Sequence, residues 1–220
     1  MGVRAGSVGV TARGRRALGI LGGTFDPIHF GHLAMAEEAR EALDLDGVIF
    51  VPAGLPPHKQ DIELSSGDDR EAMLRLAVQG NPSFEVSRTE LDRPGPSYTV
   101  VTIAEFAAQS ARDLRPEPVF IMSAEALEGL PTWHQPQRIL ELCLIAVAPR
   151  PGAALPDREV LGNWFPGLEE RFLALPGPRL GHASSDIRAR AASGRSIRYL
   201  VPGSVASYIA EHHLYLKAGP

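Results

Sequence analysis

Residues 17–32 read ALGILGGTFDPIHFGH, which is an apolar run, a glycine pair and two histidines three positions apart. The apolar run from Ala17 to Leu21 is short and ends at Gly22-Gly23, which predicts a buried strand. Phe30 to Leu43 follows with apolar side chains at helical spacing and charged side chains between them, which predicts an amphipathic helix. A strand that leads through a glycine turn into a helix is typical of an α/β fold.

The same alternation of strand and helix continues along the chain. Further strands are predicted at Val48–Val51, Phe84–Ser87, Val119–Met122 and Leu142–Ala148, and further helices after an N-cap at Ser66, at Ser97–Ala108 and, capped, at Ser204–Leu214. Because parallel strands need crossover connections, this order predicts a doubly wound, mostly parallel sheet with helices on both faces. Residues 149–183 are rich in Pro and Gly and are predicted to be mainly loop. We expect one domain over residues 17–220 with a small C-terminal helical part, behind a flexible leader over residues 1–16.

The composition argues against several classes of protein. Of the 220 residues, 44% are hydrophobic and 22% are charged, so the chain can bury a substantial core. A net charge of -4 argues against a protein that binds nucleic acid through bulk basic charge. The single cysteine, Cys143, excludes an intrachain disulfide and a cysteine cluster for metal. Since no apolar stretch approaches the ~20 residues of a membrane-spanning helix, we expect a cytoplasmic protein with no membrane partner, and homo-oligomerisation is left open.

The glycine turn after the first predicted strand has the features of a phosphate site. Ligands of open α/β sheets lie beyond the carboxyl ends of the strands. Gly22 and Gly23 allow backbone amides to approach a phosphate, and the helix that follows adds unpaired N–H groups and a positive dipole end. His29 and His32 are predicted to project from one face of a helical turn, where both rings can donate hydrogen bonds to phosphate oxygens. Gly31 between them leaves room for a nucleotide against the backbone.

Other interpretations fit this turn less well. The chain has no GxxxxGK[ST] sequence, and the glycine spacing is not that of GxGxxG, which disfavours a Walker loop and a dinucleotide-binding turn. The HxxH spacing lacks the intervening acid and the i,i+4 geometry of the HExxH zinc motif. A metal site and a purely structural histidine pair stay as alternatives to phosphate binding.

The motif GGTFDPIHFGH at residues 22–32 resembles the GGTFDPxHxGH signature of bacterial nicotinate-nucleotide adenylyltransferases, which belong to the HxGH nucleotidyltransferase superfamily. The similarity continues in order over roughly residues 17–215. PAGLPPHK at 52–59 resembles the family's PxxxPPHK loop, SYT at 97–99 its SYT segment, WH at 133–134 its tryptophan segment and ASSDIR at 183–188 its SSTxIR motif. The resemblance implies a Rossmann-like nucleotidyltransferase fold and transfer of the adenylyl group of ATP to nicotinate mononucleotide, giving nicotinate adenine dinucleotide and pyrophosphate in NAD biosynthesis.

The ATP side of the expected site draws on three segments. Arg188 is predicted in the first turn of a helix capped by Ser184 or Ser185, where its planar guanidinium matches phosphate oxygens; the alternative is a surface arginine. Together with the resemblance, this gives His29, His32 and Arg188 as catalytic residues. The expected ATP-binding residues are Gly22, Gly23, Thr24, Phe25, Gly31, Ser123, Glu125, Ser184 and Ser185. Mg²⁺ is expected to bridge the leaving phosphates with water in most of its shell, so we expect no metal site made of protein ligands.

The mononucleotide side is expected to combine a basic loop, a helix start and an aromatic ring. His58 and Lys59 follow a proline pair and could bind a phosphate, the alternative being a solvated turn. Ser97, Tyr98 and Thr99 begin a predicted helix, and the resemblance implies that its free amides receive the carboxylate of nicotinate mononucleotide. The resemblance also implies that Trp133 stacks on the pyridine ring beside His134, while the alternative is a tryptophan of the core.

The chain departs from the family pattern at two places. Ser123-Ala124-Glu125 stands where the family usually has Gly-x-Asp after the fourth strand. The start of the SSTxIR motif reads Ala183-Ser184-Ser185, and His182 stands before it in place of the usual apolar or acidic residue. The first departure is the one feature that favours a nucleotide-binding sensor without catalysis, whereas the intact His29, His32 and Arg188 favour an enzyme. Another HxGH transferase, such as one acting on phosphopantetheine, is a second alternative, against which the PPHK, SYT and tryptophan segments argue.

Overall fold

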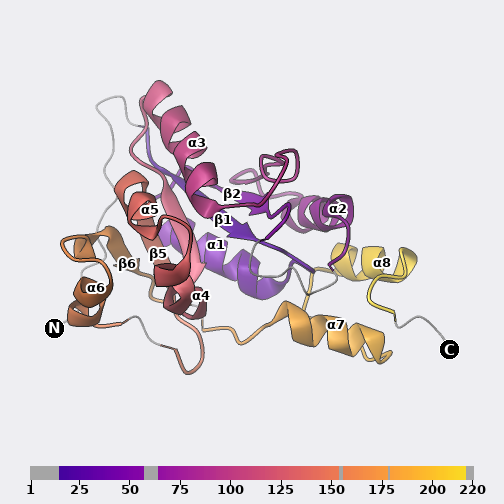
Figure 1. The fold of residues 1–220 in the computed structure, drawn as a ribbon. Coiled ribbons are helices and arrows are strands. Elements are labelled where there is room, and N and C mark those ends of the chain that lie inside the picture. The colour runs from indigo at the N-terminus through magenta and orange to yellow at the C-terminus, as the bar shows by residue number, and fades with distance from the viewer. Residues whose placement is uncertain (1–14, 57–63, 154–155, 178, 217–220) are drawn as a thin grey trace.

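The computed structural model describes residues 15–56, 64–153, 156–177 and 179–216, and the chain there forms one six-stranded sheet (Figure 1). Every strand pair is parallel, and the strand order is β3-β2-β1-β4-β5-β6. The strands are β1 (Leu18–Gly23), β2 (Gly47–Pro52), β3 (Phe84–Val86), β4 (Val119–Ser123), β5 (Leu144–Ala148) and β6 (Phe172–Ala174). The predicted doubly wound parallel sheet is therefore confirmed.

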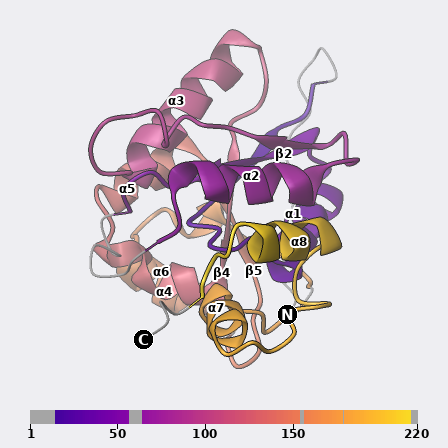
Figure 2. The same cartoon turned by 90° about the vertical axis from the view of Figure 1, so that its right-hand side faces the viewer.

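Helices cover both faces of the sheet (Figures 1 and 2). On one face, α1 (Phe30–Ala42), α2 (Gly67–Val78), α7 (Ser184–Ala192) and α8 (Gly203–Glu211) contribute to a common core. On the other face, α3 (Thr99–Arg112), α4 (Ala124–Gly129), α5 (Pro136–Leu142) and α6 (Arg158–Trp164) form a second core. Two single 3₁₀ turns complete the elements, η1 (Leu130–Thr132) and η2 (Glu169–Arg171).

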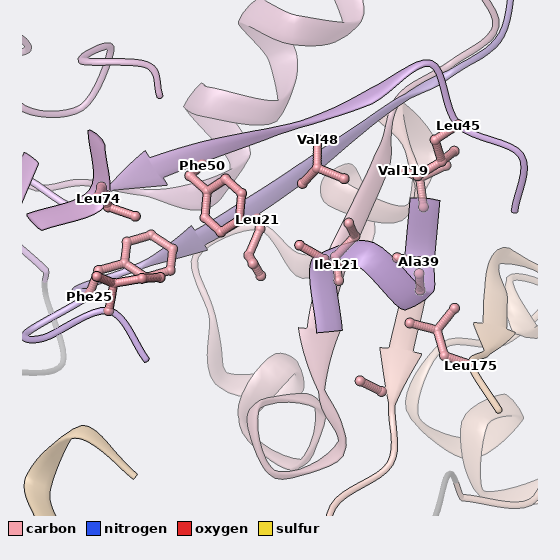
Figure 3. Packing of buried hydrophobic residues seen from close by; sticks show 14 of the residues in the cluster. Leu21, Phe25, Ala39, Leu45, Val48, Phe50, Leu74, Val119, Ile121 and Leu175 are labelled. Atoms are coloured by element: carbon pink, nitrogen blue, oxygen red, sulfur yellow. The ribbon is translucent and has the colours of Figure 1, made fainter. Parts of the chain in front are cut away.

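The apolar strands supply side chains to both cores because neighbouring residues of a strand point to opposite faces. In β4, Val119 and Ile121 belong to the core under α1, whereas Phe120 and Met122 belong to the core under α3. Figure 3 shows the first of these cores, in which Phe25 from the glycine turn lies near Phe50 of β2. All six residues of β2 are buried, which is typical of a parallel strand covered on both faces.

The predicted strands and the first three predicted helices are confirmed within a few residues, and the errors lie in short elements. Residues 149–183 contain α6 and the edge strand β6 as well as loop, and α4 and α5 were not predicted at all. The helices α4, α5 and α6 span only six or seven residues, which is too short to show a helical period. The last helix begins at Gly203 with Pro202 as its N-cap, so the predicted cap at Ser204 is wrong.

The structure describes only the last two residues of the leader that we expect over residues 1–16. Residues 1–14 of the expected leader lie outside the described ranges, while Arg15 donates to the Asp113 carbonyl (2.9 Å) and Arg16 forms an ion pair with Asp44 (3.0 Å). A search of the described helices finds none whose length and apolar character would let it cross a bilayer.

The cap of α2 gives a test of the helix assignments. Ser66 Oγ accepts a hydrogen bond from the Asp69 amide (3.0 Å), whereas Ser204 Oγ only donates to the Leu76 carbonyl (3.2 Å) at the surface. We expect Ser66→Ala to lower the free energy of unfolding by about 1 kcal/mol, because it removes a helix cap. Ser204→Ala is the matched control and should change it by less than about 0.5 kcal/mol. Urea unfolding measures both, and equal losses would contradict the cap assignment.

Candidate active site

The site forms at the point in the strand order where successive connections between strands change direction. β1 lies between β2 and β4, so the connections leave it toward opposite faces and the carboxyl ends of β1 and β4 open a crevice. A cavity of about 300 Å³ occupies this crevice. Its lining comprises Ile20, Gly22, Gly23, Thr24, Val51, Ala53, Pro56, Glu90, Ser97, Tyr98, Thr99, Thr102, Phe120, Ala126, Trp133 and His134.

The cavity brings the glycine turn together with all the expected mononucleotide-binding residues that the structure describes. Its aromatic wall is built from two pairs of rings. The centroids of Tyr98 and His134 lie 4.4 Å apart, and Trp133 meets Phe120 edge-on at 6.2 Å and 74°. Trp133 is half-buried, so it belongs partly to the core and partly to the cavity wall. His58 and Lys59 lie outside the described residues.

The SYT segment is fixed by hydrogen bonds to neighbouring loops. Ser97 Oγ accepts from the amides of Gly54 (3.0 Å) and Leu55 (3.1 Å), so this hydroxyl braces the loop after β2. Behind it, the Thr102 hydroxyl donates to Glu90 (2.6 Å), and burial raises the pKa of Glu90. Tyr98 is the N-cap of α3 and its side chain makes no capping hydrogen bond within the described residues. The first amides of α3 therefore stay candidates for a ligand carboxylate.

The two motif histidines lie together, but in a different way from the predicted helical turn. His29 is the N-cap of α1 and is extended, with φ of -146°, while His32 lies in the first turn. Their rings stack with centroids 3.7 Å apart and an interplanar angle of 15°. His29 Nδ1 accepts a hydrogen bond from the His32 amide (3.3 Å). The proton of a neutral His29 ring therefore sits on Nε2, which is the atom left to donate to a ligand.

The start of α1 offers fewer amides to a phosphate than the sequence predicted. The Phe30 amide donates to the Leu200 carbonyl (3.1 Å), and the His32 amide donates to His29. The expectation of a set of unpaired helix amides is therefore wrong in part, because the chain before α8 and the His29 ring already occupy them. Hydrogen bonds from side chains must contribute more to holding an anion here.

His29 is neutral at physiological pH. Burial first, and then the positive charges of His182 and Arg150, lower the pKa of His29 to about 4. Gly31 fits between these groups: a Cβ on it would lie 3.0 Å from His29 Nδ1 and 3.3 Å from His182 Cβ. The glycine is required by the packing of the two histidines themselves, in addition to the space it leaves for a nucleotide.

The SSTxIR-like segment anchors to the glycine turn through its side chains. Ser184 Oγ donates to the Pro27 carbonyl (2.9 Å), and Arg188 Nη1 donates to the Asp26 carbonyl (2.7 Å). The predicted caps at Ser184 and Ser185 are wrong, because the N-cap of α7 is Ala183 and Arg188 lies in the second turn. The hydroxyl of Ser184 serves the loop instead, which places Arg188 beside the histidine motif.

Two side chains from distant segments, the buried Arg70 and the half-buried Tyr215, fix the same turn, and the sequence assigned a role to neither. Arg70 of α2 donates through Nη1 to the carbonyls of Thr24 (3.0 Å) and Ala53 (2.7 Å). The Tyr215 hydroxyl donates to the carboxylate of Asp26 (2.6 Å), and burial, followed by that hydrogen bond, raises the pKa of Tyr215. No local pattern signals either contact, because each joins residues far apart in the chain.

The remaining expected ATP-binding residues lie around the rim or in the core. Phe25 is buried and contacts His32 edge-on at 5.1 Å, so its side chain packs the turn. Ser123 is the N-cap of α4 and accepts from the Ala126 amide (3.2 Å). Glu125, in the first turn of α4, pairs with Arg150 at 3.5 Å. The Ser123-Ala124-Glu125 departure thus builds a helix start at the end of β4.

The amino-acid sequence of this chain is similar to that of known proteins. The sequence profile of the cytidylyltransferase-like family matches residues 20–190. A protein of Roseiflexus sp. (strain RS-1), named probable nicotinate-nucleotide adenylyltransferase, is 50% identical over 90% of this chain and 97% of its own length. Its namesake from Thermomicrobium roseum is 48% identical over 90% of this chain and 91% of its own length. The chain belongs to the nicotinate-nucleotide adenylyltransferase family.

Solved structures support the same fold. Nicotinic acid mononucleotide adenylyltransferase of Plasmodium falciparum, solved in complex with APC, superposes with a TM-score of 0.72 and covers 91% of this chain and 97% of that chain. The same protein in complex with NaAD gives the same TM-score at 16% identity. At such low identity the likeness shows that this member of the adenylyltransferase family has the Rossmann-like nucleotidyltransferase fold.

The buried imidazole of His29 gives a testable pH dependence. The folded-state pKa of His29, about 4, lies below the ordinary 6.5. As pH falls from 6.5 toward 4, the unfolded chain therefore takes up a proton on this ring before the folded chain does, and the free energy of unfolding decreases. We expect NMR titration of the ring to show this low pKa without ligand and an upward shift with pyrophosphate, since an anion favours the protonated form. An ordinary pKa in the ligand-free protein would contradict the burial argument.

Proposed function

We propose that the paired histidines and the aromatic cavity together carry out adenylyl transfer from ATP to nicotinate mononucleotide. The supporting observation is that a nucleotide-phosphate motif and a ring-binding wall share one edge of the sheet. Gly22, Gly23 and Thr24 border the same cavity as Tyr98 and Trp133. This arrangement lets a pyridine nucleotide lie with its ring on the aromatic wall and its phosphate at the glycine turn. The relatives' names describe the same acceptor, nicotinate nucleotide.

In this proposal the reaction is a direct in-line displacement. A phosphate oxygen of the mononucleotide attacks the α-phosphorus of ATP, a new P–O bond forms, and the bond from the α-phosphorus to the bridging oxygen breaks to release pyrophosphate. The nucleophile is already an anion, so it needs no base and no covalent enzyme intermediate. Catalysis then consists of positioning and charge stabilisation. Orientation alone can contribute about 7–11 kcal/mol to lowering such a barrier.

The residues assigned to this role are donors aimed at phosphate. His29 Nε2 and the stacked His32 ring supply neutral or protonated imidazoles, and Arg188 supplies a permanent charge. Within the described ranges, no group of three or more His, Cys, Asp or Glu side chains gathers to hold a metal. In this proposal Mg²⁺ enters with ATP, where phosphate oxygens and water would hold it, and its charge would offset that of the leaving pyrophosphate.

The proposal is tested by identifying the product made from ATP and nicotinate mononucleotide. We expect nicotinate adenine dinucleotide and pyrophosphate in equal amounts. A parallel reaction with nicotinamide mononucleotide measures the choice between carboxylate and amide. Turnover with phosphopantetheine in place of nicotinate mononucleotide would show another HxGH transferase, and ATP binding without any turnover would show a sensor; either result would overturn the proposal.

Loss of one motif histidine should affect turnover more than folding. We expect His32→Ala to lower kcat by roughly 10²–10³, which is the scale for removing one preorganised donor from a site of this kind. The control is His212→Ala, because His212 is exposed and stacks on Tyr208 away from the cavity. Steady-state kinetics with both substrates measures the effect. Near-normal turnover in His32→Ala would remove the role we assign to it.

Loss of the Trp133 ring from the aromatic wall should weaken binding of the mononucleotide but not of ATP. We expect Trp133→Ala to raise the KM for the mononucleotide about tenfold, the scale for losing one stacked base, while the KM for ATP stays nearly constant. Trp133→Phe should retain most of the affinity, because a ring is kept. Trp164→Ala is the matched control, since Trp164 is also half-buried against the same core but does not line the cavity. Equal losses for both substrates would indicate a structural tryptophan.

A further inference from the structure

Two buried donor atoms beside His29 lack a hydrogen-bond partner among the described residues. They are Arg150 Nε and His182 Nδ1. Arg150 follows β5, and His182 lies just before α7, so two separate connections bring them to the same place. The centroids of the His182 and His29 rings are 6.0 Å apart. Buried polar atoms are nearly always paired, so two orphaned donors in one location point to a ligand that accepts hydrogen bonds.

The charges around these atoms favour an anion. The side chains of His182 and Arg150 both act electrostatically on His29, so three basic side chains lie close together. Glu125 is the acidic side chain that pairs with Arg150, at 3.5 Å. The Glu125 side chain is 60% exposed and that of Arg150 is 19% exposed, so solvent screens the carboxylate and the guanidinium is only weakly neutralised. An anion among them would be attracted to the guanidinium of Arg150 and would favour the protonated form of the otherwise neutral His29.

The available space lies on the side of the site away from the aromatic wall. Arg150 borders a second cavity, of about 480 Å³, formed at the ends of β5 and β6 and also lined by Arg179. Trp133 and Tyr98 line the first cavity instead, and neither Arg150 nor His182 does. The stacked rings of His29 and His32 lie next to His182. Because Arg150 acts on His29 and borders a cavity that shares no lining residue with the first, phosphates held by Arg150 would not occupy the mononucleotide cavity.

We propose that Arg150 and His182 bind the β- and γ-phosphates of ATP and retain them as the leaving pyrophosphate. This inference rests on the proposed adenylyl transfer and adds two phosphate-binding residues to it. Arg150 donates through Nε, and His182 through Nδ1, to non-bridging phosphate oxygens. One nitrogen of Arg188 already donates to the Asp26 carbonyl. Additional hydrogen-bond donors would therefore help to stabilise the negative charge that builds on the leaving pyrophosphate. His182 stands where the family pattern has an apolar or acidic residue, so the motif by itself does not imply this donor.

The test is the affinity of the full chain for magnesium pyrophosphate, measured by calorimetry. We expect Arg150→Gln and His182→Ala each to weaken binding about tenfold, the scale of one charge-assisted hydrogen bond. Affinity for nicotinate mononucleotide should stay unchanged in both variants. His182→Asn should restore most of the pyrophosphate affinity, because the amide nitrogen of Asn can occupy the position of Nδ1 and donate there.

Matched controls come from basic residues elsewhere on the surface. Arg158, which pairs with Glu170, and His212, on α8's C-terminal side, are both exposed. Arg158→Gln and His212→Ala should bind pyrophosphate as the unaltered chain does. Wild-type affinity in either Arg150→Gln or His182→Ala would overturn the proposal. An equal loss of mononucleotide affinity would also overturn it, by showing general damage, and failure of His182→Asn to restore binding would overturn the assignment of Nδ1.

The binding measurement requires no turnover, so it separates this proposal from the proposed function. If the unaltered chain makes no dinucleotide but both variants lose pyrophosphate affinity, adenylyl transfer fails and the phosphate site stands. If the chain makes the dinucleotide but both variants bind pyrophosphate normally, the transfer stands and the roles of Arg150 and His182 fail.

Discussion

The backbone between β1 and α1 is buried, and its carbonyl groups must find hydrogen-bond donors inside the protein. Three side chains from other elements meet this requirement. Arg70 donates to the Thr24 carbonyl, Arg188 to the Asp26 carbonyl and Ser184 to the Pro27 carbonyl. These contacts draw α2 and α7 onto the same turn, and the histidine pair is positioned by the loop that they hold. Folding of the turn and assembly of the site are therefore one event.

This constraint gives Arg188 two roles that do not exclude each other. A guanidinium carries five N–H donors in a fixed plane, and the Asp26 carbonyl takes one nitrogen of Arg188. The remaining donors can face a phosphate while the first holds the loop. A lysine at this position would carry its three donors on a single nitrogen, so it could not reach two acceptors as far apart as the guanidinium can. The proposed phosphate contact is thus made by a side chain whose orientation is already fixed.

The sequence predicted the parts of the fold that depend on local pattern. The apolar runs of β1, β2, β4 and β5 and the amphipathic α1 are visible as buried strands and a one-sided helix. The edge strand β6 and the short helices α4 to α6 were not predicted, because too few residues carry each pattern. The capping of α7 was misassigned for another reason. Ser184 has the residue type of a cap, but a tertiary partner, the Pro27 carbonyl, competes for its hydroxyl.

For the site, the sequence identified residues within motifs and missed those that act from a distance. The glycine turn, the SYT segment and Trp133 all line one cavity. The order of these motifs along the chain, through its resemblance to the family, implied that they belong to one site. Arg70, Arg150 and Tyr215 carry no motif, and their significance appears only when folding brings them to the turn or to His29. His182 was visible only as a departure from the family pattern. The roles of all these residues toward substrates stay predictions.

The hydrogen bond between Tyr215 and Asp26 joins residues 189 positions apart. A ribosome makes the chain from its N-terminus, so the turn that carries the histidine motif is synthesised well before Tyr215, which donates to its carboxylate. Until Tyr215 leaves the exit tunnel, the Asp26 carboxylate lacks this hydroxyl donor, although the Ser65 amide can donate to its other oxygen (3.2 Å). The nascent chain can thus build its sheet before it can close its nucleotide turn.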